Sequence, residues 1–163
     1  MVFARLTPMR PRTHIFAVAI EDYQDTSFQS VVYAEQDAQS FVEAWQKLGV
    51  NSDDCKLLTS DEATVGCIHS ELRYVLSKVG PDDRFVMFLA GHINSLQGSC
   101  LILAHETRQN TIEISSLALI ELLNEIRKIK CDQVFGVQSF QEFSYKERIA
   151  KSFPHYQFCQ GFY

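Results

Sequence analysis

Residues 84–92 read RFVMFLAGH, an apolar run that stops at a glycine followed by a histidine. Runs without polar interruption are typical of central strands covered on both faces, as in parallel sheets flanked by helices. In open α/β sheets the reactive groups lie at the carboxyl ends of the strands. The stretch therefore predicts a buried strand that ends at His92 and presents it where a catalytic base would stand, although a lone histidine there is more often structural.

The composition bounds the class of protein. With 163 residues, 46% of them hydrophobic, and a net charge of -5, the chain is expected to form about one globular domain without a nucleic-acid surface. The longest apolar run is too short for a membrane helix, and the start has no apolar core of the kind that a signal peptide carries. We therefore expect a cytoplasmic protein that binds neither nucleic acid nor membrane.

The cysteines form no recognisable ligand pattern. They are odd in number and include no C-x-x-C pair and no Cys/His spacing typical of zinc sites. We expect reduced, mostly buried thiols, no metal site and no cofactor. The five are Cys55, Cys67, Cys100, Cys131 and Cys159.

Strands and helices are predicted to alternate along the chain after an extended lead-in over residues 1–13. A loop is expected over 93–99, and Thr64 and either Ser115 or Ser116 are expected to cap helices. The alternation predicts a mainly parallel, three-layer α/β domain. Strands are expected at 14–20, 56–59, 84–92, 101–103, 132–137 running on to 140, and 155–158, and helices at 34–48, 64–79 and 115–129, with Ala38, Phe41, Val42, Trp45 and Leu48 on one face of the first.

Several short motifs recur in an order that points to a family. They are AIEDY at 19–23, AEQDA at 34–38, LLT at 57–59 with EAT at 62–64, FLAGH at 88–92 and LILAHE at 101–106. Together they resemble the caspase-like cysteine peptidases, the group that includes bacterial metacaspase-like and orthocaspase-like domains, over about residues 14–140. The resemblance implies the three-layer caspase/hemoglobinase fold, a mainly parallel sheet flanked by helices.

The same resemblance implies a catalytic pair that this sequence alters. His92 matches the general base, and the next strand should end at a nucleophilic cysteine, but Ser139 stands there within VQSFQE. A thiol is readily ionised by a nearby imidazole, whereas an alcohol needs a well-oriented base that removes its proton during attack. The resemblance therefore predicts a peptidase site that is inert as written, with Gly91 and Gln138 beside it in contact with a bound peptide.

Acidic residues near the ends of the first strand and the start of the first helix give a possible specificity pocket. In basic-specific members of the family such groups accept Arg or Lys, so Asp22 and Asp37 are candidate substrate-binding residues. Solvated loop carboxylates are the alternative, because such residues are common on surfaces. Val137 at the usual acidic position weakens the specificity interpretation.

Three functions remain open at this point. The leading one is a pseudo-peptidase that binds or regulates a peptide or protein partner. The next is an active cysteine endopeptidase represented by a Cys-to-Ser form, and the last is an unrelated doubly wound binding domain, which the lack of a Gly-rich phosphate loop disfavours. Cys100 and Cys131 are weak candidates for a substitute nucleophile.

The domain is expected over residues 14–163 and is short for the family. We expect it to lack the C-terminal small-subunit part, so that a homodimer or a complementary domain supplies the missing strands.

Overall fold

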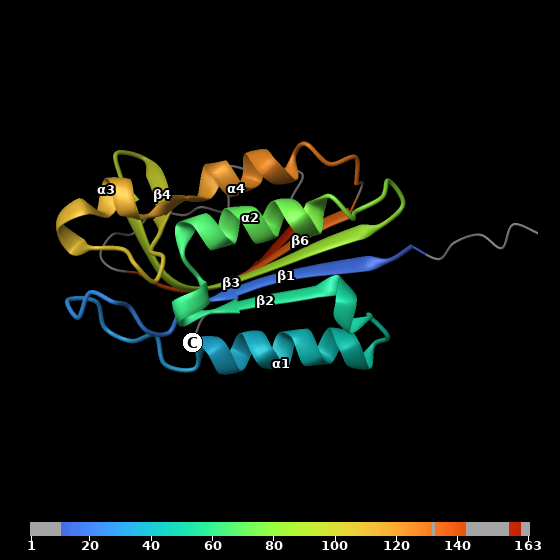
Figure 1. Ribbon diagram of the computed structural model, residues 1–163, viewed down its shortest axis with the longest axis horizontal. Coiled ribbons are helices and arrows are strands. Elements are labelled where there is room, and N and C mark those ends of the chain that lie inside the picture. Colours follow the sequence, from blue (N-terminus) through green and yellow to red (C-terminus); the bar gives the residue numbers. More distant parts are fainter. Residues whose placement is uncertain (1–10, 132, 143–156, 161–163) are drawn as a thin grey trace, which may run out of the picture.

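The computed structural model describes residues 11–131, 133–142 and 157–160, the last two segments through their backbone. Its centre is a seven-stranded sheet (Figure 1). The parallel strands follow the order β2-β1-β3-β6-β7, and β4 and β5 continue antiparallel from the far part of β3. The strands are β1 (Thr13–Ala19), β2 (Cys55–Thr59), β3 (Arg84–Leu96), β4 (Ser99–Ile102), β5 (Leu117–Ala118), β6 (Gln133–Glu142) and β7 (Gln157–Gln160).

Helices cover both faces of the sheet, as Figure 1 shows. Helix α1 (Ala34–Lys47) lies on one face, and α2 (Val65–Leu76) and α4 (Leu119–Ile126) lie on the other. The short α3 (Ile112–Ser115) lies toward the carboxyl end of β1. The predicted three-layer α/β arrangement is therefore confirmed. Among the described helices, none has the length and apolarity that a membrane crossing requires.

Two apolar layers explain why the run in β3 has no polar interruption. Val86, Phe88 and Ala90 pack on the α1 side. The alternate residues Phe85 and Leu89 pack on the side of α2 and α4. Because both faces of the strand are buried, each position in the run needs an apolar side chain.

The prediction that the strand ends at His92 is wrong. Strand β3 continues to Leu96, and residues 93–96 pair antiparallel with β4. The turn of this hairpin is Gln97 at φ 50° and Gly98 at φ 81°, which fits a two-residue type I′ connection. The polar residues within 93–99 predict a loop, but this segment forms part of a hairpin, and main-chain pairing between its strands needs no apolar pattern.

The helix boundaries are partly as expected. The Thr64 side chain caps α2 by accepting a hydrogen bond from the Cys67 N–H (3.3 Å), as predicted. The expected serine cap of α4 is wrong, since α4 begins after Ala118, and the Ser115 hydroxyl instead donates to the Thr111 carbonyl (2.7 Å). Leu48, expected on the buried face of the first helix, lies beyond its end and is 78% exposed.

A charged network joins the amino ends of the central strands. Fully buried His14 lies between two carboxylates, with Nε2 3.3 Å from Asp83 Oδ2 and Nδ1 3.6 Å from Asp54 Oδ1. The Arg12 guanidinium pairs with Asp54, and the Arg12 N–H donates to Asp83 (2.8 Å). This network holds together the amino ends of the strands, at the end of the sheet opposite the candidate active site.

Candidate active site

The candidate base His92 lies where the pairing partners of β3 change. Strand β1 pairs with β3 as far as Ala90, whose carbonyl accepts the Ile20 N–H (2.9 Å). On the same edge of β3, the His92 carbonyl accepts the Leu103 N–H (3.0 Å) where the chain leaves β4. On the other edge His92 pairs with Gln141 of β6. His92 is thus inside the sheet and only 3% exposed.

The imidazole of His92 is oriented by the loop that follows β1. Its Nε2 lies 2.7 Å from the Gln29 carbonyl oxygen. Because a carbonyl only accepts, Nε2 carries the proton, and in the neutral ring the lone pair is on Nδ1. The loop therefore selects the tautomer as well as the direction of the ring.

Tyr23 fills the gap that β1 leaves beside His92. Its hydroxyl accepts the His92 main-chain N–H (2.8 Å), which would otherwise lack the strand partner that β1 no longer provides. Its ring stacks on the imidazole, with centroids 5.3 Å apart and planes at 28°, and also contacts Phe28. Burial raises the pKa of Tyr23, so the phenol stays neutral beside the histidine.

Gly91 allows this close approach. Its φ of 153° lies in a region that side-chain-bearing residues rarely adopt, and a Cβ there would stand 3.2 Å from the Tyr23 hydroxyl. A larger residue would push Tyr23 away from His92. Gly91 therefore has a structural role in positioning the base.

The backbone of β6 brings Ser139 next to this region. Ser139 pairs with Ala90 and Gln138 with Leu89, in a parallel register that continues to His92 and Gln141. From strand rise and spacing, the Cα atoms of Ser139 and His92 are about 8 Å apart. The side chains of Ser139 and Gln138 lie outside the described part, so the expected pairing of His92 with Ser139 stays a prediction.

The acidic candidates lie near one another in sequence but serve separate contacts. The exposed Asp22 carboxylate accepts the Ser30 hydroxyl (2.6 Å). Asp37 is half-buried in the first turn of α1, and among the described residues no hydrogen bond joins it to Asp22. Instead, Ser60 bridges the loop and helix: its hydroxyl accepts the Glu21 N–H (3.2 Å) and donates to the Glu35 carboxylate.

The substitute nucleophiles are unsuited to attack. Cys100 lies in β4, and burial raises its pKa to about 11, so it remains a thiol at neutral pH. Cys131 lies before β6 at the opposite edge of the sheet, where its thiol donates to the Asp83 carbonyl (2.8 Å). In the described part of the chain, no cluster of three His, Cys, Asp or Glu side chains could hold a metal ion.

Sequence reasoning missed two contributors to the site. Tyr23 belongs to the AIEDY motif at 19–23, but its role depends on a contact with His92, which is distant in sequence. Gln29 acts through its main-chain carbonyl, which any residue type could provide, so no sequence signal could have identified it.

Comparison with known proteins supports the fold. No protein-family model and no curated protein matches the sequence. Among solved structures, the Drosophila initiator caspase Dronc is similar with a TM-score of 0.66 and 17% identity, covering 93% of this chain and 55% of that chain. The structure of pro-Sf-caspase-1 gives a TM-score of 0.62 and 11% identity, covering 88% and 51%.

A bacterial protein shares the same arrangement. Protein GSU0716 from Geobacter sulfurreducens gives a TM-score of 0.62 and 14% identity, covering 81% of this chain and 50% of that chain. The chain thus spans about half the length of these solved structures. At such low identities the similarity establishes a caspase-like fold and not an activity.

Proposed function

We propose that this caspase-like chain is a pseudo-peptidase that binds a peptide or protein partner without hydrolysing it. One observation carries the proposal: His92 is 3% exposed and held beneath the loop that follows β1, while serine stands at the position that the family resemblance assigns to the nucleophile.

The chemistry of the pair supports this reading. A serine nucleophile needs a base whose resulting imidazolium is stabilised, which serine hydrolases achieve with a carboxylate on the far ring nitrogen. Here that nitrogen faces the Gln29 carbonyl, which orients the ring but carries no charge. Oxygen at position 139 is therefore expected to stay protonated and inert.

An active cysteine endopeptidase, represented by a Cys-to-Ser form, is the second candidate. The orientation of His92 favours it, because the Gln29 contact places the lone pair of the neutral ring on Nδ1. A thiol with an ordinary pKa of about 8.5 needs much less help from a base than an alcohol does. The retained Gly91, which permits the Tyr23 contact, fits this reading as well.

Replacing Ser139 with cysteine distinguishes the pseudo-peptidase from the active peptidase. We would measure hydrolysis of a pooled fluorogenic peptide library by Ser139→Cys, by the unchanged protein and by Ser139→Cys carrying His92→Ala. A pseudo-peptidase stays silent in all three while circular dichroism shows that each is folded. Cleavage by Ser139→Cys that disappears with His92→Ala would overturn the proposal and establish the peptidase machinery.

We propose further that a bound peptide lies along Gly91 and Gln138, with Asp22 and Asp37 near a basic side chain, as in metacaspase-like members. Asp22 follows β1 and Asp37 is in the first turn of α1, which supports the acidic part of this proposal. Binding of a blocked Arg-containing peptide, compared with its norleucine analogue, tests this. Asp22→Asn with Asp37→Asn should remove the preference for Arg, and an unchanged preference would refute it.

Association with another chain is the remaining proposal. Strand β7 pairs with β6, and within the described residues no strand covers its other edge, so its peptide groups are available to a homodimer partner or a complementary domain. A monomeric mass by light scattering at micromolar concentration would count against self-association. The described cysteines are free, which fits the reducing cytoplasm that we propose as its location.

A further inference from the structure

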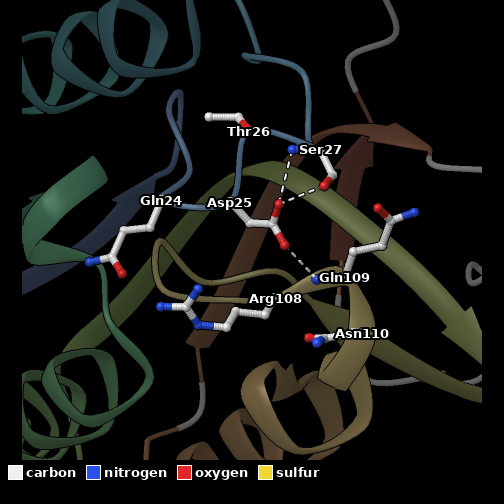
Figure 2. A pocket seen from close by; sticks show the side chains of 7 residues that line it. All are labelled: Gln24, Asp25, Thr26, Ser27, Arg108, Gln109 and Asn110. Carbon is white, nitrogen blue, oxygen red and sulfur yellow. Dashed lines mark hydrogen bonds between the residues drawn. The ribbon is translucent and has the colours of Figure 1, made fainter.

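A polar depression of about 660 Å³ lies beside the loop that orients His92. Residues 24–27, which follow β1, form one wall, and residues 108–110, which follow β4, form the other (Figure 2). Ligand sites in α/β sheets lie at this edge, beyond the carboxyl ends of the parallel strands. None of the roles described above uses these residues.

Asp25 forms hydrogen bonds with both walls. Its Oδ1 accepts both the N–H (3.0 Å) and the hydroxyl (2.6 Å) of Ser27, and its Oδ2 accepts the Gln109 N–H (2.9 Å). The Ser27 hydroxyl above all, together with these N–H groups, lowers the pKa of Asp25 to about 2, so the carboxylate stays ionised. The Gln24 N–H adds a bond to the His105 carbonyl (2.9 Å). The depression is therefore pre-organised.

The side chains around Asp25 are left available. In the part of the chain that the structure describes, no hydrogen bond or ion pair engages the guanidinium of Arg108 or the amides of Gln24, Gln109 and Asn110. In Figure 2, Gln24 and Arg108 lie on one side of the Asp25 carboxylate and Gln109 and Asn110 on the other. The Arg108 guanidinium is suited to bind a carboxylate, and the amides on both sides of Asp25 are suited to bind the peptide groups attached to it.

An exposed apolar residue lies next in sequence to Ser115, which bonds to Thr107 and Arg108. Helix α3 folds back on residues 107–108, because the Thr107 hydroxyl donates to the Ser115 carbonyl (2.8 Å) and the Arg108 N–H donates to the Ser115 hydroxyl (3.1 Å). Ile114 on this helix is 85% exposed. An exposed isoleucine on the helix that bonds to Arg108 is a candidate contact for an apolar side chain of a ligand that binds Arg108.

We propose that the depression binds the carboxyl terminus of a peptide or protein partner. A chain terminus carries a carboxylate, a peptide group and a last side chain within one residue, and Arg108, the amides and Ile114 match these three features. The ionised Asp25 offsets the Arg108 charge, which favours a singly charged carboxylate over a doubly charged phosphate. The inference rests on the proposed function, since it names the chemistry by which the partner is recognised.

The test is a ¹H–¹⁵N NMR titration with four probes. They are acetyl-Gly-Ala-Ala-Leu with a free carboxylate, the same peptide as its C-terminal amide, acetyl-Ala-Asp-Ala-amide and inorganic phosphate. We expect the free carboxylate to shift resonances at residues 24–27 and 108–110 and to bind at least tenfold more tightly than the amide. Equal binding of the amide, tighter binding of the internal aspartate or displacement by phosphate would each overturn the assignment.

Variants localise the effect. Arg108→Gln should weaken the free-carboxylate peptide about tenfold, the loss of a charge-assisted contact, and Ile114→Ser should weaken it severalfold. Arg127→Gln, an exposed arginine at the end of α4, is the matched control and should leave the affinity unchanged. An unaltered affinity in Arg108→Gln, with native chemical-shift dispersion, would refute the site.

The outcome is separable from that of the proposed function. If Ser139→Cys cleaves peptides, the pseudo-peptidase proposal fails while a titration that maps to Arg108 still stands. If Ser139→Cys is silent and the terminal carboxylate does not bind, only the recognition chemistry is wrong.

Discussion

The histidine half of the candidate site is well formed, independently of what stands at position 139. The contacts that hold His92 include the Gln29 carbonyl on the ring, the Tyr23 ring stacked beside it and the Tyr23 hydroxyl on its main-chain N–H. A histidine held this way is a structural element of the sheet as well as a candidate base. Loss of catalysis would therefore not by itself release the residue from its role.

Tyr23→Phe is expected to destabilise the protein by about 1–2 kcal/mol, because the buried His92 N–H loses its acceptor while the ring contacts remain. Urea unfolding measures the change. Tyr74→Phe, at a tyrosine that is 59% exposed, is the matched control and should stay within about 0.5 kcal/mol of the unchanged protein. Equal effects of the two substitutions would mean that the Tyr23 hydroxyl contributes nothing specific.

Gly91→Ala should cost about 1–3 kcal/mol, since alanine at φ 153° is strained and its Cβ would stand 3.2 Å from the Tyr23 hydroxyl. Thermal unfolding followed by circular dichroism is the measurement. Gly66→Ala provides the opposite control, because Gly66 is in α2 with open space around its Cβ, and alanine there should stabilise by roughly 1 kcal/mol. An unchanged melting temperature in Gly91→Ala would show that the backbone at residue 91 relaxes without cost.

At the scale of elements, β3 is the strand on which the site depends. Its first part pairs with β1 and its last part with β4, and Tyr23 occupies the interval between them. The apolar residues of β3 could be predicted as a strand because burial on both faces requires an unbroken run. Its continuation past His92 could not, because hairpin pairing there depends on residues that the local pattern does not mark.

Gln97→Asn tests the turn that makes this continuation possible. Both central residues of the hairpin have positive φ, and asparagine adopts that conformation more readily than glutamine. The substitution should raise the free energy of unfolding by up to about 1 kcal/mol, measured by urea denaturation. A lower stability than that of the unchanged protein would show that the turn is not of type I′.

At the scale of the whole molecule, the sheet has two chemically different ends. The amino end carries the network of Arg12, Asp54, His14 and Asp83, while the carboxyl end carries His92 and the depression around Asp25. The charged side chains at the amino end pair with one another, whereas the side-chain donors of Arg108 and the neighbouring amides at the carboxyl end have no partner among the described residues. The unused donors are the reason for placing the proposed ligand site at the carboxyl end, and the paired groups at the amino end stabilise the fold.

Acid should destabilise the fold from both ends. Burial raises the pKa of Asp83, but hydrogen bonds from Gly80, Arg12 and His14 outweigh it, so the net pKa lies below its usual value. The pKa of Asp25 is lowered from 3.8 to about 2. Carboxyls with depressed folded-state pKa values contribute stability above their unfolded pKa and lose it as pH falls through the folded value. The melting temperature should thus fall between pH 4 and about 2, chiefly because of Asp83, since Asp25 is solvent-screened.

Asp83→Asn isolates the amino-end contribution. It should lower the melting temperature at pH 7 and flatten the acid dependence, since asparagine has no proton to gain. A melting temperature that is constant or rises on acidification from pH 4 to about 2 would contradict the assignment of these carboxyls.

The sequence by itself determined the layers of this protein and the strand that carries His92. Apolar runs and helical spacing are local patterns, and burial makes them necessary. Only the tertiary structure decided that Gln29 and Tyr23 hold His92, that β3 continues past it, and that Asp25 meets a main-chain N–H at residue 109. These contacts join residues far apart in sequence through backbone groups, which every residue type carries and no pattern marks.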